Sequence, residues 1–102
     1  MDIGQTIVVK DRIILAVEGI EGTDETIKRG GILGRKNAVC IKVARSKQDL
    51  RMDIPAIGID TIKTLVRFKV NCLAIESNKM LIVEKEKLIK LAERSNICVV
   101  SV

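Results

Sequence analysis

Residues 37–44 restrict the folds open to this chain more than any other stretch, because Lys42 is the one charged side chain among them. An apolar run of this length, rich in β-branched residues, predicts a strand buried inside a sheet. In α/β proteins, functional sites tend to lie just beyond the carboxyl ends of such strands. The segment that follows residue 44 is therefore the first place to look for function.

Short apolar runs and amphipathic segments alternate along the rest of the chain. Asp11 and Arg12 form a predicted hairpin turn, and the returning strand at 13–17 is apolar throughout, so we expect it to be buried on both faces. We expect 80–83 to pair with 72–75. The expected elements are strands at 6–10, 13–17, 37–44, 72–75, 80–83 and 97–102, a short loop or strand at 56–58, and helices at 23–33, from residue 60 or 61, and at 84–94. This order predicts an α/β fold, a single small domain in which a mixed β-sheet packs with about three helices.

The chain has almost no aromatic side chains, since Phe68 is the only one in 102 residues while hydrophobic residues make up 47%. Its core must therefore be aliphatic. Proteins that bind single-stranded nucleic acids usually stack bases on aromatic rings, so we expect no nucleic-acid partner. A net charge of +5, spread over 18 basic and 13 acidic residues, favours a phosphate-bearing ligand over DNA.

Cys40, Cys72 and Cys98 lie far apart in apolar runs, and the chain contains no histidine. We expect all three to be small buried core residues, because no imidazole is present to activate a thiol or to complete a zinc site. Free cysteines favour the cytoplasm. The sequence shows neither a signal peptide nor an apolar stretch near 18 residues, so any contact with lipid is expected at the membrane surface.

Residues 18–25 hold four acids and two glycines just before the first helix. Thr23 is the expected N-cap, with Asp24 in the first turn, and Gly30 and Gly31 are expected to weaken the helix and end it near Leu33. The segment is either a capped loop or a site where glycine amides approach a phosphate and the carboxylates hold a metal ion.

Residues 47–55 pack charged residues more densely than folding alone requires. If this stretch is extended, as the proline at its end favours, Asp49, Arg51 and Asp53 share one face. The two carboxylates would then lie about 6 to 7 Å apart, a spacing that suits one hydrated metal ion or one phosphate. The alternative is an edge strand whose charges face water and keep it from pairing.

Several motifs, taken together, give the chain its resemblance to a known family. They are Asp2-Ile3-Gly4-Gln5, residues 17–24, Lys42-Val43-Ala44, and residues 48–55 followed by Ile57-Gly58. In this order and spacing they resemble the C-terminal domain of the LpxI-type UDP-2,3-diacylglucosamine pyrophosphatases, over nearly the whole chain. The resemblance implies a Mg²⁺-assisted hydrolase of lipid A biosynthesis that converts UDP-2,3-diacylglucosamine to 2,3-diacylglucosamine 1-phosphate (lipid X) and UMP.

The resemblance also implies roles for individual residues. The catalytic residues would be Asp53, Asp49 and Asp24, the metal ligands Asp53, Asp49 and Glu21, and the substrate-binding residues Arg51, Lys42, Gln5 and Thr23. Met52 stands where the family usually has an aromatic residue, and Met fills space adaptably.

Family members also carry an N-terminal domain, and their C-terminal domain has helical sequence before the Asp-Ile-Gly-Gln motif. We therefore expect residues 1–102 to be an LpxI-type C-terminal domain without those parts, working with a separate N-terminal domain. We also expect a homo-oligomer, located in the cytoplasm at the inner face of the inner membrane with peripheral membrane contact. The alternative is a non-catalytic binding or oligomerisation module, a remnant of the enzyme.

Overall fold

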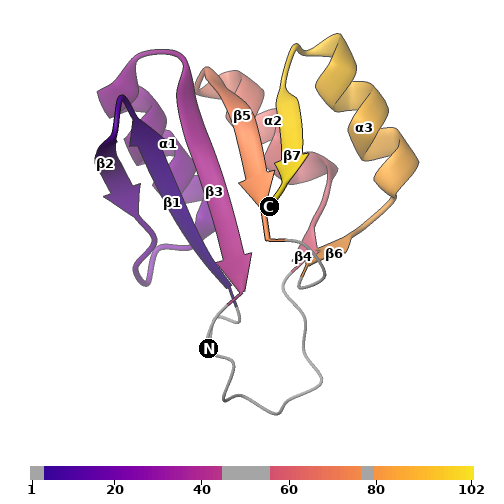
Figure 1. The fold of residues 1–102 in the computed structure, drawn as a ribbon, viewed down its shortest axis with the longest axis horizontal. Coiled ribbons are helices and arrows are strands. Elements are labelled where there is room, and N and C mark those ends of the chain that lie inside the picture. Colours follow the sequence, from indigo (N-terminus) through magenta and orange to yellow (C-terminus); the bar gives the residue numbers. More distant parts are fainter. Residues whose placement is uncertain (1–3, 45–55, 77–79) are drawn as a thin grey trace.

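The computed structural model describes residues 4–44, 56–76 and 80–102, and these contain seven strands and three helices (Figure 1). In chain order the elements are β1 (Gly4–Lys10), β2 (Ile13–Val17), α1 (Thr23–Gly34), β3 (Ala38–Ala44), β4 (Ala56–Ile57), α2 (Ile59–Arg67), β5 (Val70–Ile75), β6 (Leu81–Ile82), α3 (Lys85–Arg94) and β7 (Cys98–Ser101).

Five strands form one mixed sheet in the order β2-β1-β3-β5-β7. β1 runs antiparallel to both β2 and β3, whereas β3, β5 and β7 are parallel to one another. The predicted turn at Asp11 and Arg12 joins β1 to β2, with φ angles of 53° and 68° that match the left-handed turns favoured in tight hairpins. The predicted α/β fold with a mixed sheet and three helices is confirmed.

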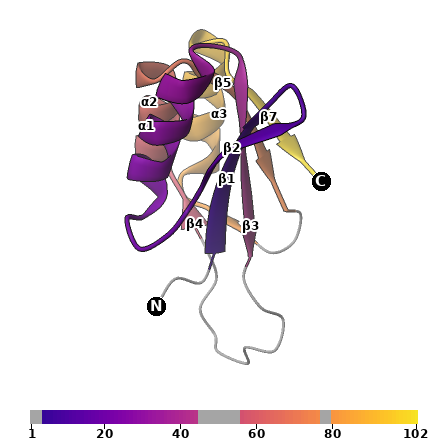
Figure 2. The ribbon, with the colours of Figure 1, turned by 90° about the vertical axis from the view of Figure 1, so that its left-hand side faces the viewer.

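All three helices lie on the same side of this sheet (Figure 2). Their apolar faces and the sheet residues that point toward them form the core, and the prediction of an aliphatic core is confirmed. The largest fully buried apolar side chains are Ile27, Ile57, Ile62, Leu65, Leu73, Leu88, Val8 and Val70. The opposite side of the sheet has no covering layer among the described elements.

Glycines let α1 pack with its backbone close against the sheet. A Cβ atom added at Gly30 would lie 2.4 Å from Cβ of Val8, and one added at Gly31 would lie 2.6 Å from the carbonyl oxygen of Phe68. The helix runs through both glycines and ends at Gly34, close to the predicted end near Leu33. Glycine lowers helix propensity, but here it removes a side chain that would hold helix and sheet apart.

The prediction that β2 is buried on both faces is wrong. Ile13 and Ile14 are 61% and 63% exposed. β2 is one of the two edge strands of the sheet, so only one neighbouring strand and one helix cover it. A continuous apolar run therefore marked a surface strand in this chain.

The predicted pairing of 80–83 with 72–75 is also wrong. β6 pairs in parallel with β4, in the register Ala56 to Leu81 and Ile57 to Ile82, and forms a separate two-stranded sheet. The partners of β5 are β3 and β7, which occupy both of its edges and leave no place for β6.

Of the three cysteines, only Cys40 is buried as predicted; Cys72 is half-buried and Cys98 is exposed. Cys98 lies opposite Cys72 on the edge strand β7, whereas the next pair, Leu73 and Val99, packs in or against the core. Because side chains alternate along a strand, Cys98 points to the side without helices. Burial raises the pKa of the Cys40 thiol to about 12.

The helices are short. α1 has 12 residues, α3 has 10 and α2 has 9, whereas a bilayer-spanning helix needs about 20 apolar residues. In the part of the chain that the structure describes, no helix is long and apolar enough to cross a membrane.

Candidate functional site

The carboxyl ends of β3 and β5 lie at one edge of the sheet, together with the N-terminal end of α1 and the small β4–β6 sheet (Figure 1). Parallel strands place their carboxyl ends at a common edge, where α/β proteins bind ligands. The charged segment at 47–55, predicted from the sequence to be functional, lies between Ala44 and Ala56. Both of these described residues belong to this edge. Asp49, Arg51 and Asp53 themselves lie outside the described residues.

Lys42 and Thr23 meet at this edge. The Lys42 ammonium donates a 2.6 Å hydrogen bond to Oγ1 of Thr23, and Oγ1 of Thr6 lies 3.4 Å from the same oxygen. Lys42 is only 9% exposed and Thr6 is fully buried. A largely buried cation therefore sits beside the first turn of a helix, and both its charge and the free N–H groups of that turn favour an anion.

The prediction that Thr23 is the N-cap is wrong by one residue. Gly22 holds that position with a φ of 91°, which glycine adopts without strain, and no side chain caps the helix. Thr23 is the first helical residue, and its hydroxyl is directed to Lys42 and Thr6. Thr23, the side chain expected to cap the start of the helix, instead belongs to the candidate site.

Glu18 is a buried carboxylate next to these groups, with 7% of its surface exposed. Its Oε1 accepts a 2.9 Å hydrogen bond from the Thr6 backbone N–H, its own N–H donates to the Thr6 carbonyl, and Gln5 donates a 3.4 Å bond to its carbonyl oxygen. Sequence reasoning missed Thr6, and it counted Glu18 only among the four acids of residues 18–25, without predicting its burial or its contact with Thr6. The signal was present in the sequence, because Thr6 lies within one apolar strand and Glu18 directly follows another. A polar side chain buried at such a position needs a hydrogen-bond partner.

Glu21 forms a separate cluster. Its Oε1 accepts a 2.7 Å bond from the Gly19 N–H, and its Oε2 pairs with Arg29 at 2.8 Å. Arg29 also donates to the Val17 carbonyl at 3.0 Å. The hydrogen bond from the Gly19 N–H, and to a smaller extent the contact with Arg29, holds the pKa of the Glu21 carboxyl below its ordinary value. These contacts fasten the loop before α1 to the end of β2.

Asp24 connects α1 to α2. Its Oδ1 accepts a 3.2 Å hydrogen bond from Oγ1 of Thr64, which also donates to the Asp60 carbonyl at 3.0 Å. Asp24 is exposed and lies one residue from Thr23, so its carboxylate stands at the same helix end as the Lys42 contact.

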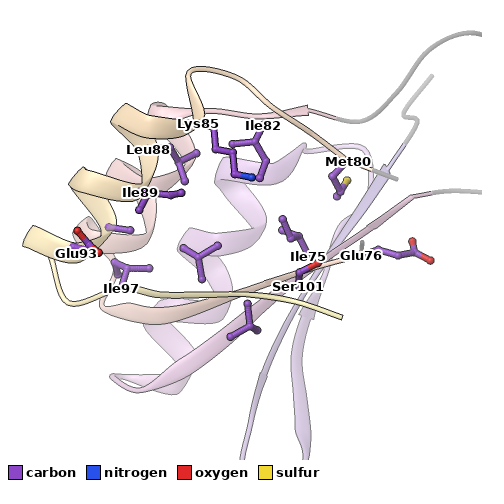
Figure 3. Close-up of a pocket in the computed structure, with 13 residues that line it drawn as sticks. Ile75, Glu76, Met80, Ile82, Lys85, Leu88, Ile89, Glu93, Ile97 and Ser101 are labelled. Atoms are coloured by element: carbon purple, nitrogen blue, oxygen red, sulfur yellow. The ribbon is translucent and has the colours of Figure 1, made fainter. Parts of the chain in front are cut away.

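An apolar pocket of about 480 Å³ opens between α3 and the strands β5 and β7 (Figure 3). Ile75, Ile82 and Leu88 lie around it, and Lys85 and Glu93 stand at its border. Glu76 is the third charged residue of the lining, and the remaining lining residues other than Ser101 are apolar. A concave, mainly aliphatic surface suits a hydrocarbon chain.

The sequence model of the LpxI C-terminal domain matches residues 1–100. The chain belongs to the LpxI C-terminal domain family. A curated family member, the UDP-2,3-diacylglucosamine pyrophosphatase LpxI of Caulobacter vibrioides, is 33% identical over 110 aligned residues. The match covers 100% of this chain but 39% of that protein, so the chain spans well under half the length of its relative.

The fold of this LpxI C-terminal domain also occurs in a protein of different sequence. Acinetobacter baumannii RibD, form 2, superposes with a TM-score of 0.56 at 12% identity, over 96% of this chain and 28% of that one. At this identity the likeness concerns the fold alone.

The structure brings some of the residues predicted for the LpxI C-terminal domain together and keeps others apart. Lys42 and Thr23 are in contact, and Asp24 is adjacent in sequence. Gln5 is kept apart from them: its neighbour Thr6 is the register partner of Lys42, so the Gln5 side chain points to the other side of the sheet, where it bonds the Glu18 carbonyl. Glu21 instead pairs with Arg29. The roles of all these residues stay predictions.

For the predicted Mg²⁺ site, Glu21 is the one proposed ligand within the described residues. Both of its oxygens already have protein partners, and no group of three acidic or cysteine side chains gathers for a metal in the ranges 4–44, 56–76 and 80–102. Asp24 offers an exposed carboxylate oxygen at the sheet edge, and Mg²⁺ prefers one or two carboxylates together with substrate phosphates. The donor chemistry fits Mg²⁺ if Asp49 and Asp53 join it.

Proposed function

We propose that this chain forms the catalytic part of a UDP-2,3-diacylglucosamine pyrophosphatase of lipid A biosynthesis. It would hydrolyse the diphosphate with water and release 2,3-diacylglucosamine 1-phosphate (lipid X) and UMP. Membership in the LpxI C-terminal domain family, together with the name of the Caulobacter relative, supports this assignment.

The observation that carries the proposal is the Lys42–Thr23 contact at the first turn of α1. A buried ammonium beside a helix N-terminus is a favourable place for a phosphate, because a positive charge and free backbone N–H groups converge there. Lys42 and Thr23 would hold the diphosphate or the sugar, together with Arg51. Gln5, on the other side of the sheet from Lys42, would contact the substrate only at the sheet edge.

The hydrolysis breaks one bond between phosphorus and the bridging oxygen and forms one bond from the same phosphorus to water. Negative charge grows on the departing phosphate, and the Lys42 ammonium would stabilise it electrostatically. The water must lose a proton, and Asp24, Asp49 and Asp53 are the carboxylates proposed to orient it and accept that proton.

Mg²⁺ is the proposed cofactor, held by Asp49 and Asp53 with Glu21 or the neighbouring Asp24. When bound, it would neutralise charge on the diphosphate. The engagement of Glu21 with Arg29 makes Asp24 the better candidate within the described residues, since the Asp24 carboxylate receives one neutral hydroxyl donor and no cation.

The pocket near α3 suits the lipid part of this substrate. The name of the Caulobacter relative specifies a diacylated sugar, and an aliphatic pocket lined by Ile75, Ile82 and Leu88 would accept an acyl chain. A substrate with acyl chains resides in a membrane, so the protein would act at the membrane surface, in the cytoplasm. The relative is longer than this chain, and the proposed partner is a further domain that completes the site.

The test is release of UMP from UDP-2,3-diacylglucosamine in Mg²⁺ by the purified chain, alone and with a separately expressed N-terminal domain. We expect release that is lost in Asp53→Asn. Asp11→Asn, in the hairpin turn, is the matched control, because asparagine tolerates the left-handed backbone there. If neither preparation releases UMP, the chain is a non-catalytic binding module.

A further inference from the structure

Cys72 and Cys98 are register partners on the neighbouring parallel strands β5 and β7. Directly opposite residues on adjacent strands project from the same side of a sheet, so both thiols lie on the side without helices (Figure 2). The next pair in the ladder, Leu73 and Val99, packs in or against the core on the other side. This packing fixes the direction in which both cysteine side chains point.

The spacing of the two strands suits a disulfide bond. Adjacent strands lie about 4.8 Å apart, and the Cα atoms of a disulfide are usually about 4.4 to 6.8 Å apart. Both cysteines are free thiols in this structure, and a hydrogen bond between their side chains already joins Cys72 to Cys98. A covalent bond between the two sulfur atoms therefore requires no change in the register of the strands.

The two thiols differ in their access to solvent and in their acidity. Cys98 is exposed, whereas Cys72 is half-buried. Burial, and after it the proximity of Cys98, raises the pKa of the Cys72 thiol above its ordinary value of 9.0, so this thiol keeps its proton near neutral pH. The thiolate is the reactive form of cysteine, and exposure decides which thiol meets an oxidant first. Cys98 is therefore placed to react first and Cys72 to react second.

We propose that Cys72 and Cys98 form a reversible dithiol–disulfide site, oxidised by small disulfide compounds of the glutathione class. The Cys98 thiolate attacks one sulfur atom of glutathione disulfide, which forms a mixed disulfide and releases the other half as a thiol. The Cys72 sulfur then gives its proton to solvent and attacks the Cys98 sulfur, which forms the protein disulfide and releases the second glutathione thiol. The two protein thiols lose two electrons and two protons, and one glutathione disulfide takes up both.

A role in core packing explains Cys40 but not this pair. Cys40 is fully buried in the core, where cysteine acts as a small apolar side chain. Cys98 is exposed on the edge strand β7, and an accessible thiol beside a second thiol is typical of cysteines that undergo reversible oxidation. Exposed disulfides are generally the more easily reduced ones, so the bond is expected to be reversible. The inference does not depend on the proposed function.

The test is oxidation of the wild-type chain by glutathione disulfide, followed by intact-mass spectrometry and peptide mapping. We expect the chain to lose the mass of two hydrogen atoms, with Cys72 linked to Cys98. Cys40 should remain a free thiol that is alkylated only after denaturation, because it is buried on the other side of the sheet. Reduced glutathione should restore all three thiols. The same oxidation in urea should give every pairing of the three cysteines, because the selection depends on the folded sheet.

Two serine variants separate the roles of the cysteines. Cys72→Ser should stop at the mixed disulfide on Cys98, because no second thiol is present to displace glutathione. Cys98→Ser should consume the Cys72 thiol at least about tenfold more slowly than the wild type, because Cys72 is half-buried and protonated. Cys40→Ala is the matched control, since it removes the one cysteine outside the pair, and it should form the disulfide at the wild-type rate.

The wild-type measurement decides the proposal without relying on the folding of any variant. A folded wild-type chain that stops at the mixed disulfide, or that does not react at Cys98, would overturn it. A disulfide that joins two chains through Cys98, or one that includes Cys40, would overturn it as well. Loss of the disulfide in Cys40→Ala would likewise show that Cys72 and Cys98 are not sufficient.

Discussion

Lys42 on β3 donates a 2.6 Å hydrogen bond to Thr23 on α1, across 19 positions of the chain. The contact joins the carboxyl end of a central strand to the first turn of the helix that covers it. It also keeps a largely buried ammonium at the sheet edge where the ligands of α/β proteins bind.

Lys42→Met tests this contact as part of an anion site. Methionine reproduces the lysine side chain as far as Cε but lacks the ammonium group, so we expect the affinity for UDP to fall about 10- to 100-fold, the effect of losing one charged hydrogen bond. Isothermal titration calorimetry measures the affinity. Lys36→Met, on the exposed connector after α1, should bind UDP like the wild type. Equal affinities in the two variants would remove Lys42 from the site.

Gly30→Ala tests the close packing of α1 on β1. The added Cβ would lie 2.4 Å from Cβ of Val8, so we expect a loss of about 1 to 3 kcal/mol in the free energy of unfolding, despite the better helix propensity of alanine. Urea denaturation measures it. Gly58→Ala is the control, because its Cβ would lie 3.9 Å from Val83 and the substitution should cost less than about 1 kcal/mol. Equal losses in both variants would contradict the packing argument.

The buried thiol of Cys40 makes stability depend on pH in the alkaline range. Its pKa rises from 9.0 to about 12 on folding, so the unfolded chain releases this proton at lower pH than the folded one. Stability is fully present below pH 9 and should fall between pH 9 and about 12, at up to about 1.4 kcal/mol per pH unit. In Cys40→Ala the fall should be shallower over the same window. Denaturant midpoints of both proteins, measured across this pH range, test the prediction. If stability falls equally steeply with pH in the wild type and in Cys40→Ala, the Cys40 thiol is not the cause.

The Glu21 carboxyl should titrate below its ordinary pKa of 4.5 in the folded chain. Arg29→Met should move the pKa part of the way back, because the Gly19 N–H, the larger cause, remains. Since the folded pKa is the lower one, the stabilisation that Glu21 provides is present above pH 4.5 and is lost as pH falls through the folded value. NMR titration of the side-chain carboxyl carbon gives both values. An unchanged pKa in Arg29→Met would exclude the ion pair as a contributor.

Local patterns were sufficient to predict most of the fold. The turn at Asp11 and Arg12, the buried strand β3 and the helix α3 each have signals within a few residues: a polar pair between apolar runs, an aliphatic run, and an amphipathic repeat with Leu88 inward. These signals predicted the order of strands and helices, and that order predicted the α/β fold class.

Apart from the N-cap of α1, which is Gly22 and not Thr23, the errors concern properties that depend on distant residues. Whether the apolar strand β2 is central or at an edge depends on which strand pairs beyond it, and β6 pairs with β4 because β3 and β7 already occupy β5. Cys98 is exposed for the same reason as Ile14, since both lie on edge strands and point to the side of the sheet without helices. Local sequence patterns therefore do not predict strand order or which side of the sheet is covered.

The candidate site was predicted only in part. Thr23 and Lys42 were selected through the family resemblance, and the structure places them in contact. The contact between Glu18 and Thr6 was not predicted, because the two residues are 12 positions apart and meet only when β2 pairs with β1. Asp49, Arg51 and Asp53, at the centre of the sequence argument, lie outside the described residues.

The glycine at position 30 bears on how accurately Lys42 and Thr23 are positioned. At Gly30 the backbone of α1 packs directly against the Val8 side chain, with no flexible side chain between them. The helix therefore has little freedom to slide or roll on the sheet. The first turn of α1 and the end of β3 are then parts of one rigid frame, so a ligand at Lys42 would find its binding groups already in place and would lose little affinity to ordering them.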